Sequence, residues 1–217
     1  MIRLVCLAMD GVLTATKSFW MELHRAYGTL EEGATLTERY LNADYQKLVD
    51  EVVGRLWKGK PAGPFIDLVA RTPYSPGIRE FFSALDGLDG ERVPRAIITG
   101  GPFELAERIR LEFGVDFIFA NQLEIRDHKI AGALHLPVGN GTATKAAIIE
   151  QLCDDLEILP QEVLYIGDSS ADADAFRVVG VSVAFNGAPE ELRRIATHVV
   201  ESGDLRDIIP LLETLRS

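Results

Sequence analysis

The sequence predicts an α/β fold, a doubly wound parallel sheet with one helical insertion. From residue 76 onward, short apolar runs typical of buried strands alternate with amphipathic helical segments. This order is found where helices cover both faces of a parallel sheet. After the first strand, a helical stretch interrupts this order. We therefore expect a core of residues 1–15 and 75–217 and an inserted unit of residues 16–74.

The composition limits the class of protein. The 217 residues, 47% apolar and 25% charged, are typical of a soluble protein of one domain, or of one domain with an insertion. No apolar run approaches the ~20 residues of a membrane span, and no signal-peptide pattern is present. The net charge of −11 argues against nucleic acid and anionic membranes as partners. Cys6 and Cys153 indicate no disulfide framework, which suits a reducing cytosol, so we expect a cytoplasmic protein. A monomer or homodimer is the default expectation.

The first elements follow from hydrophobic spacing. Residues 2–7 form an apolar run that predicts a buried strand. Residues 17–74 contain no strong strand run, and their side chains recur at helical spacing at Trp20, Leu23, His24 and Tyr27, then at Leu48, Val52 and Leu56. Pro76 is favoured at the first position of a helix, so it predicts a helix over residues 76–85.

Strands and helices then alternate along the chain. The predicted strands are residues 95–99, 116–120, 162–166, 181–185 and 197–200. The predicted helices are residues 102–113, 144–152, 172–178, 188–195 and 204–215. Residues 121–136 predict a hairpin that turns at Asp127-His128-Lys129. A sheet of this kind binds its ligands at the carboxyl ends of the strands, where the strand order reverses.

The first strand ends in Ala8-Met9-Asp10-Gly11-Val12-Leu13-Thr14. Residues two apart on a strand point to the same side, so Ala8 and Asp10 are expected to face the same ligand. Taken alone, an Asp before a Gly is more typical of a turn. Thr99-Gly100-Gly101-Pro102 follows the second core strand and places a hydroxyl and glycine amides at a helix start. This segment is either an anion site or an ordinary strand-to-helix turn.

Two further motifs lie in the second half of the chain. Lys145 begins a helix after residues 139–144, where its ammonium can neutralise a phosphate and stabilise transition-state oxygens; a lone helical lysine is more often solvent-facing. Asp168 and Asp172 follow a buried strand four residues apart. Mg²⁺ binds few protein carboxylates and uses the substrate's phosphate. We expect Asp168 to be a direct ligand, Asp172 to be a ligand or to support one, and Asp174 to be solvated.

In this order the motifs resemble those of the haloacid dehalogenase superfamily of phosphotransferases, within its phosphoserine phosphatase-like branch. The resemblance also includes the insertion as a helical cap, Gly-Gly-Pro-Phe after Thr99, Ala120-Asn121, Val183-Ala184-Phe185-Asn186 and Asp204-Leu205. It implies a Rossmann-like core and a Mg²⁺-dependent phosphatase that forms an aspartyl phosphate. The implied partner is a small-molecule phosphate ester.

The resemblance assigns a role to each motif residue. The family motif is Asp-x-Asp-Gly-(Val/Thr)-Leu-Thr, and its first Asp is the nucleophile; this position is Ala8, whose methyl group cannot attack phosphorus. The chain is therefore expected to be inactive. The second Asp, Asp10, is the general acid and base, and its backbone carbonyl is a metal ligand. The substrate-binding residues are Thr99, Gly100 and Lys145, and the remaining metal ligands are Asp168 and Asp172.

Three positions depart from true phosphoserine phosphatases. Lys17 stands where a Glu holds the substrate's ammonium, Val52 where a cap arginine holds its carboxylate, and Ala171 where an Asn precedes the second Asp of the last motif. Phosphoserine is therefore an unsafe assignment. Lys17 indicates a more anionic ligand, which it would contact, or is a flexible surface lysine.

The remaining aromatic side chains and histidines have simpler interpretations. Phe19 and Trp20 are expected to pack within the cap, with lining of the substrate entrance as the alternative, and Trp57 to pack between cap and core. The four histidines show no zinc-like spacing. Three functions stay open: a phosphatase represented by a nucleophile-dead variant, as would be made to trap substrate; a natural pseudophosphatase that binds a phosphorylated ligand or a protein partner; and a phosphotransferase to an alcohol.

Overall fold

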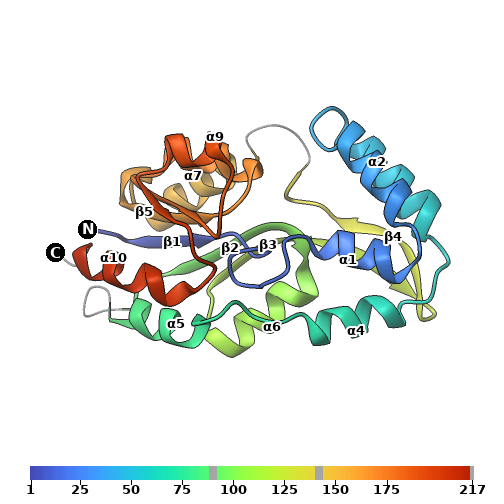
Figure 1. Ribbon diagram of the computed structural model, residues 1–217, viewed down its shortest axis with the longest axis horizontal. Coiled ribbons are helices and arrows are strands. Elements are labelled where there is room, and N and C mark those ends of the chain that lie inside the picture. The colour runs from blue at the N-terminus through green and yellow to red at the C-terminus, as the bar shows by residue number, and fades with distance from the viewer. Residues whose placement is uncertain (88–91, 140–143, 216–217) are drawn as a thin grey trace.

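The computed structural model describes residues 1–87, 92–139 and 144–215. Its strands are β1 (Leu4–Leu7), β2 (Arg95–Pro102), β3 (Phe117–Arg126), β4 (Lys129–His135), β5 (Val163–Gly167), β6 (Val181–Phe185) and β7 (His198–Val200). They form one sheet of order β4-β3-β2-β1-β5-β6-β7 (Figure 1). All neighbours pair in parallel except β3 and β4, which are antiparallel. The predicted α/β class with a doubly wound, mostly parallel sheet is confirmed.

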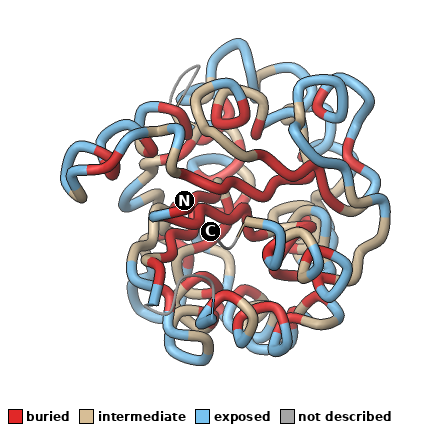
Figure 2. Tube along the Cα trace, turned by 90° about the vertical axis from the view of Figure 1, so that its left-hand side faces the viewer, coloured by how far each residue is buried: buried red, intermediate tan, exposed pale blue. Residues whose placement is uncertain are grey.

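Helices cover both faces of the sheet. The core helices are α5 (Ile78–Asp86), α6 (Phe103–Phe113), α7 (Thr144–Leu156), α8 (Ala173–Val178), α9 (Glu190–Ile195) and α10 (Ile209–Thr214). Side chains of β1 alternate between the two faces: Val5 and Leu7 belong to the cluster with α5, α6 and α10, and Leu4 and Cys6 to the cluster with α7, α8 and α9. Figure 2 shows buried segments of the chain crossing the middle of the molecule; β1 and β5 are buried along their whole length.

The strand order of the sheet reverses at β1. This strand lies between β2 and β5, and Cys6 pairs in register with Ala96 on one side and Tyr165 on the other. Sequence order increases away from β1 in both directions. The carboxyl ends of β1, β2 and β5 therefore border the crevice in which sheets of this kind bind ligands.

Residues 17–74 are mainly helical, as the spacing predicted. They form α1 (Phe19–Ala26), α2 (Leu30–Tyr40), α3 (Tyr45–Val49), a π-helical segment Asp50–Trp57, and α4 (Gly63–Arg71). The insertion rests on the hairpin of β3 and β4, because Gly59 N donates to Ile130 O (2.8 Å) and Ala62 N donates to His128 O (2.8 Å). In the described part of the chain, no helix is long and apolar enough to cross a membrane.

Several element boundaries differ from the predictions. Helix α5 begins at Ile78 and not at Pro76, because Gly77 precedes it in a left-handed conformation (φ 76°) in which a Cβ would collide with Asp204. Strand β2 continues through Pro102, so the two glycines after Thr99 belong to the strand and α6 begins at Phe103.

Strand β3 combines a predicted strand with half of the predicted hairpin. Its first residues pair in parallel with β2, and the continuation from Gln122 pairs antiparallel with β4. Helix α7 extends to Leu156, four residues beyond the prediction, and buries Cys153 in the core. Residues 140–143, which belong to the glycine-containing approach to Lys145, lie outside the described residues.

Candidate active site

The loop after β1 carries Ala8 and Asp10 to the crevice. Both line the same cavity, although β1 itself ends at Leu7. Ala8 N donates to Ile166 O (2.9 Å), which fixes the loop against β5. Gly11 has φ 74°, and a Cβ there would lie 2.0 Å from Asp168 Oδ2. Only glycine allows this loop to approach Asp168 so closely.

Asp10 is a half-buried carboxyl group with one oxygen available. Its Oδ2 accepts a hydrogen bond from Phe19 N (2.8 Å), whereas its buried Oδ1 has no partner among the described residues. Burial raises the pKa of Asp10 to about 6. The nearby charge of Asp168 also raises this pKa, whereas the hydrogen bond from Phe19 lowers it. A carboxyl group with this pKa can give or take a proton near neutral pH.

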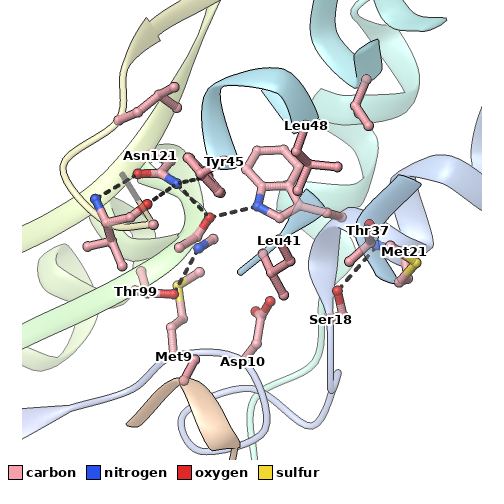
Figure 3. A pocket seen from close by; sticks show the side chains of 18 of the residues that line it. Met9, Asp10, Ser18, Met21, Thr37, Leu41, Tyr45, Leu48, Thr99 and Asn121 are labelled. Atoms are coloured by element: carbon pink, nitrogen blue, oxygen red, sulfur yellow. Dashed lines mark hydrogen bonds between the residues drawn. The ribbon is translucent and has the colours of Figure 1, made fainter. Parts of the chain in front are cut away.

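The end of β2 is hydrogen-bonded to the helical insertion of residues 16–74 (Figure 3). Thr99 Oγ1 accepts a hydrogen bond from Gly101 N (2.9 Å). Gly100 O accepts from Trp20 Nε1 (2.7 Å) and from Asn121 Nδ2 (3.1 Å). Asn121 Nδ2 also donates to Tyr45 Oη (2.8 Å). The backbone of Gly100 is therefore held between α1 and β3.

Lys145, which lines the cavity, forms an ion pair with Asp172, which lies behind it. Lys145 Nζ donates to Asp172 Oδ1 (2.5 Å) and to Tyr165 Oη (3.2 Å). Asp172 is fully buried and also accepts hydrogen bonds from the backbone of Asp168 and Ser169. Burial opposes its ionisation, but Lys145 and the hydrogen bonds hold the pKa of Asp172 below its usual value. Asp172 thus anchors Lys145 and the loop after β5.

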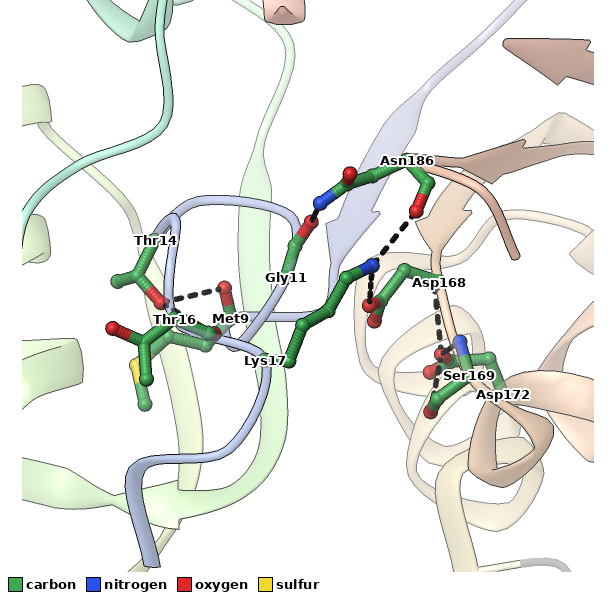
Figure 4. Close-up of polar contacts among 9 residues, drawn as sticks. All are labelled: Met9, Gly11, Thr14, Thr16, Lys17, Asp168, Ser169, Asp172 and Asn186. Atoms are coloured by element: carbon green, nitrogen blue, oxygen red, sulfur yellow. Dashed lines mark hydrogen bonds and ion pairs between the residues drawn. The ribbon is translucent and has the colours of Figure 1, made fainter. Parts of the chain in front are cut away.

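A second ion pair joins the start of the helical insertion to the loop after β5 (Figure 4). Lys17 Nζ lies 3.0 Å from Asp168 Oδ2 and donates to Asn186 O (2.7 Å). Asn186 Nδ2 in turn donates to Gly11 O (2.8 Å). Burial raises the pKa of Asp168, and Lys17 acts in the opposite direction. The ammonium group predicted to face the substrate is bound to the carboxylate predicted to face the metal.

One cavity of about 310 Å³ contains most of the predicted site. The predicted site residues that line it are Ala8, Asp10, Lys17, Thr99, Gly100, Lys145 and Asp168. The lining does not include Asp172, which lies behind Lys145. Trp20 and Trp57 also line the cavity. For Trp20, this agrees with the alternative to packing within the cap, namely that the residue lines the entrance of the site.

As arranged, these residues do not fit Mg²⁺. Position 8 offers only a methyl group, and the Asp172 carboxylate is already hydrogen-bonded to Lys145. The Asp168 carboxylate is paired with the ammonium group of Lys17. Within the described residues, no group of three or more His, Cys, Asp and Glu side chains could hold a metal ion. Asp10 and Asp168 remain as carboxylates facing the cavity, and the second would accept a cation only after Lys17 leaves it.

Two asparagines belong to the site although sequence reasoning gave them no role there. Asn121 joins Gly100, Tyr45 and Val138, and Asn186 joins Gly11 and Lys17. The signal for Asn186 was an Asn-Gly pair directly after a predicted strand. Asn186 indeed adopts a left-handed conformation with φ 56°. Asn121 belongs to the Ala120-Asn121 pair that carries part of the family resemblance, but the resemblance gave this residue no role at the site.

The fold and the crevice define the class of this protein. The family model for haloacid dehalogenase-like hydrolases matches residues 2–180. The chain therefore belongs to the haloacid dehalogenase-like hydrolases.

Within this family, the chain is similar to phosphoserine phosphatases. It is 28% identical over 213 residues to that of Archaeoglobus fulgidus, covering 97% of this chain and 60% of the relative. It is 26% identical over 188 residues to that of Streptococcus thermophilus, covering 86% of this chain and 85% of the relative. A solved apo structure of phosphoserine phosphatase has a TM-score of 0.83 at 25% identity and covers 97% of this chain and 98% of that chain. The chain spans only 60% and 64% of the relatives from A. fulgidus and Idiomarina loihiensis.

Proposed function

We propose that the cavity binds a small phosphate monoester, and that the chain with Ala8 binds this ester without hydrolysing it. The observation that carries the proposal is that Asp10, Thr99, Lys145 and Asp168 line one cavity together with Ala8. The similarity to phosphoserine phosphatases supports phosphate-ester chemistry. In this proposal, Ala8 occupies the position of the missing nucleophile.

The chemistry proposed for the Ala8→Asp form has two steps. The carboxylate at position 8 attacks phosphorus, the bond to the ester oxygen breaks, and Asp10 gives its proton to the leaving alkoxide. Asp10 then takes a proton from the water that attacks the aspartyl phosphate. Thr99, the Gly100 amide and Lys145 bind the phosphoryl oxygens, and residues 16–74 act as a cap that excludes water and selects the substrate.

The first test is phosphate release by the Ala8→Asp protein. We expect turnover of small phosphate esters by this variant and none by the parent chain. The Mg²⁺ requirement implied by the family is proposed for this form, because position 8 then adds a carboxylate beside Asp10. The metal would also have to displace Lys17 from Asp168, and turnover should stop with a chelator. Asp10→Asn in the same background should retain ester binding and lose most turnover. Unchanged turnover would remove Asp10 from the acid and base role.

A second candidate is a natural binding protein, a pseudophosphatase. The ion pair between Lys17 and Asp168 favours this candidate. The pair blocks a predicted metal ligand, and it does so whichever residue stands at position 8. If Ala8→Asp hydrolyses no ester while the parent chain still binds phosphate compounds, the binding function is supported. Transfer of phosphate to added alcohols by Ala8→Asp would instead indicate a phosphotransferase.

A further inference from the structure

The charged groups of the cavity lie on its core side. Asp10, Lys145 and Asp168 come from core segments, and Lys17 turns back from the start of the cap to Asp168. Within residues 18–57, all of which the structure describes, the cavity lining contains no Asp, Glu, Lys or Arg. His24 is the titratable imidazole of this wall, and burial lowers its pKa to about 4, so it is neutral at pH 7.

The cap side of the cavity presents mainly carbon. Its aliphatic lining comes from α1, the residue after α2, α3 and the π-helical segment, and consists of Met21, Leu41, Leu48, Val49, Val52 and Val53. Figure 3 shows Met21, Leu41 and Leu48 on the side of the cavity opposite Thr99. Val52 occupies the position where a cap arginine was expected from the family pattern.

The aromatic residues of this wall use their polar atoms within the protein. Trp20 Nε1 donates to Gly100 O (2.7 Å), and Trp57 Nε1 donates to Thr29 Oγ1 (3.4 Å). The Tyr45 hydroxyl accepts from Asn121 Nδ2 (2.8 Å). These groups are therefore engaged by internal partners, and the rings offer apolar surface to a ligand.

Such a wall disfavours the alcohol part of phosphoserine. Its ammonium and carboxylate would lose hydration against the cap and find no opposite charge there, which is costly in a partly enclosed cavity. An apolar group at the same place would instead remove carbon surface from water. The cavity volume of about 310 Å³ is near the lower end for small-molecule sites, so it suits a phosphoryl group with one ring or a short alkyl chain.

We propose that the ligand of this chain is a phosphate monoester of an uncharged, apolar alcohol or phenol. This inference rests on the proposed function, because it takes the core side of the cavity to hold the phosphoryl group. It names the chemistry of the remaining part of the ligand. The residues that select it are the aliphatic and aromatic side chains of the cap.

The test is calorimetric binding to the unaltered Ala8 protein, with four probes: inorganic phosphate, phenyl phosphate, n-butyl phosphate and phosphoserine. We expect phenyl and butyl phosphate to bind on the order of tenfold more tightly than phosphoserine. If phosphoserine binds as tightly as phenyl phosphate or more tightly, the inference about the alcohol is wrong and the phosphate site stands. If neither inorganic phosphate nor any ester binds, the proposed function itself fails.

A variant pair tests the cap wall directly. Leu41 lines the cavity and is 43% exposed, so Leu41→Gln should fold normally. We expect phenyl phosphate to bind Leu41→Gln about threefold more weakly, with inorganic phosphate unaffected. Leu111→Gln is the matched control, because Leu111 is 71% exposed on α6 and does not line the cavity. Equal affinities of both variants for phenyl phosphate would overturn the assignment of this wall to the alcohol.

Discussion

Lys17 places a positive charge against Asp168, inside a cavity that also contains Asp10. Its ammonium group binds one carboxylate oxygen and one backbone carbonyl oxygen, which are the same kinds of ligand that Mg²⁺ prefers. At this position the chain therefore supplies its own cation. A metal ion would have to compete with a side chain whose effective concentration is high and constant.

Removal of this lysine should create affinity for a divalent metal. In Lys17→Met, Asp168 loses its counter-charge, so we expect Mg²⁺ or Mn²⁺ to raise the melting temperature by a few degrees, with little effect on the parent chain. Lys58→Met, which removes a lysine exposed at the surface of the cap, is the control. If Lys17→Met responds to metal no more than the control does, Lys17 does not compete with a cation.

The ion pair of Lys145 with Asp172 should contribute more to stability than an exposed pair. Asp172→Asn leaves the Lys145 ammonium buried without a counter-charge, and we expect the free energy of unfolding to fall by about 3 kcal/mol. Glu190→Gln breaks an exposed pair with Arg194 and should change stability little. Urea denaturation of both variants measures the difference, and similar midpoints would show that the buried pair has no special weight.

For single residues, the sequence predicts most of the side chains that reach the cavity, with Asp172 as the exception, but it does not predict which residues they bind. Asp10, Thr99 and Lys145 follow from their positions at strand and helix ends, since those ends meet at one edge of the sheet. The pairing of Lys17 with Asp168 joins positions 151 apart in sequence. It depends on how the chain leaves the first motif, and side-chain reach of this kind has no local signature.

Among the elements, helix α1 links the helical insertion to two segments that line the cavity. Phe19 N, in its first turn, donates to Asp10, and Trp20 donates to Gly100. Later in the same helix, the His24 ring packs 4.6 Å from the ring of Trp57 and hydrogen-bonds Thr29. One short helix thus connects the interior of the helical insertion with the loop after β1 and with β2.

The burial of His24 should make the stability of the protein depend on pH. Burial lowers its pKa from about 6.5 to about 4 in the folded chain, so between these values the unfolded chain binds more protons. The stability linked to His24 is fully present above pH 6.5 and is lost as the pH falls toward 4, by about 3 kcal/mol at most. Urea denaturation from pH 7.5 to 4.5 should show a shallower pH dependence for His24→Gln.

His198→Gln is the control for this experiment, because His198 is an exposed residue of β7. The pH dependence of His24→Gln is compared with that of this variant and with that of the parent chain. If the free energy of unfolding changed with pH in the same way for His24→Gln and the parent chain, protonation of His24 would not destabilise the folded protein.

Periodicity identifies the elements better than it identifies their ends. The alternation of strands and helices after residue 94 is present as predicted, because each buried strand is a short apolar run. The ends shift where pairing with other elements extends a strand, as for Gly100 and Gly101 in β2 and for the second half of β3. The π-helical segment Asp50–Trp57 has an i→i+5 hydrogen-bonding pattern that a helical spacing rule does not distinguish.

The whole molecule carries a net charge of −11, although its proposed ligand is an anion. The cavity itself holds Asp10 and Asp168 against Lys17 and Lys145, so its charged side chains nearly cancel. The net negative charge of the protein repels a phosphate dianion at long range, and salt screens this repulsion. Contacts inside the cavity are screened much less.

Added salt should therefore strengthen ligand binding. Raising NaCl from about 50 to about 500 mM shortens the Debye length several-fold, and we expect about a twofold gain in affinity for phenyl phosphate by calorimetry. Potassium sulfate is unsuitable here, since sulfate is itself a phosphate mimic. A steady loss of affinity with NaCl would show that a local positive field, rather than the net charge, dominates the approach of the ligand.

Both tryptophans of the chain, Trp20 and Trp57, line the cavity, with ring centroids 5.8 Å apart. The ultraviolet emission of this protein therefore originates almost entirely at one place, and the sheet, whose aromatic residues are Phe and Tyr, contributes little to it. Arrival of a ligand, or displacement of Trp20 from Gly100, changes the surroundings of the emitting rings directly. The molecule has an intrinsic optical reporter of its own binding cavity, without a dye or a label.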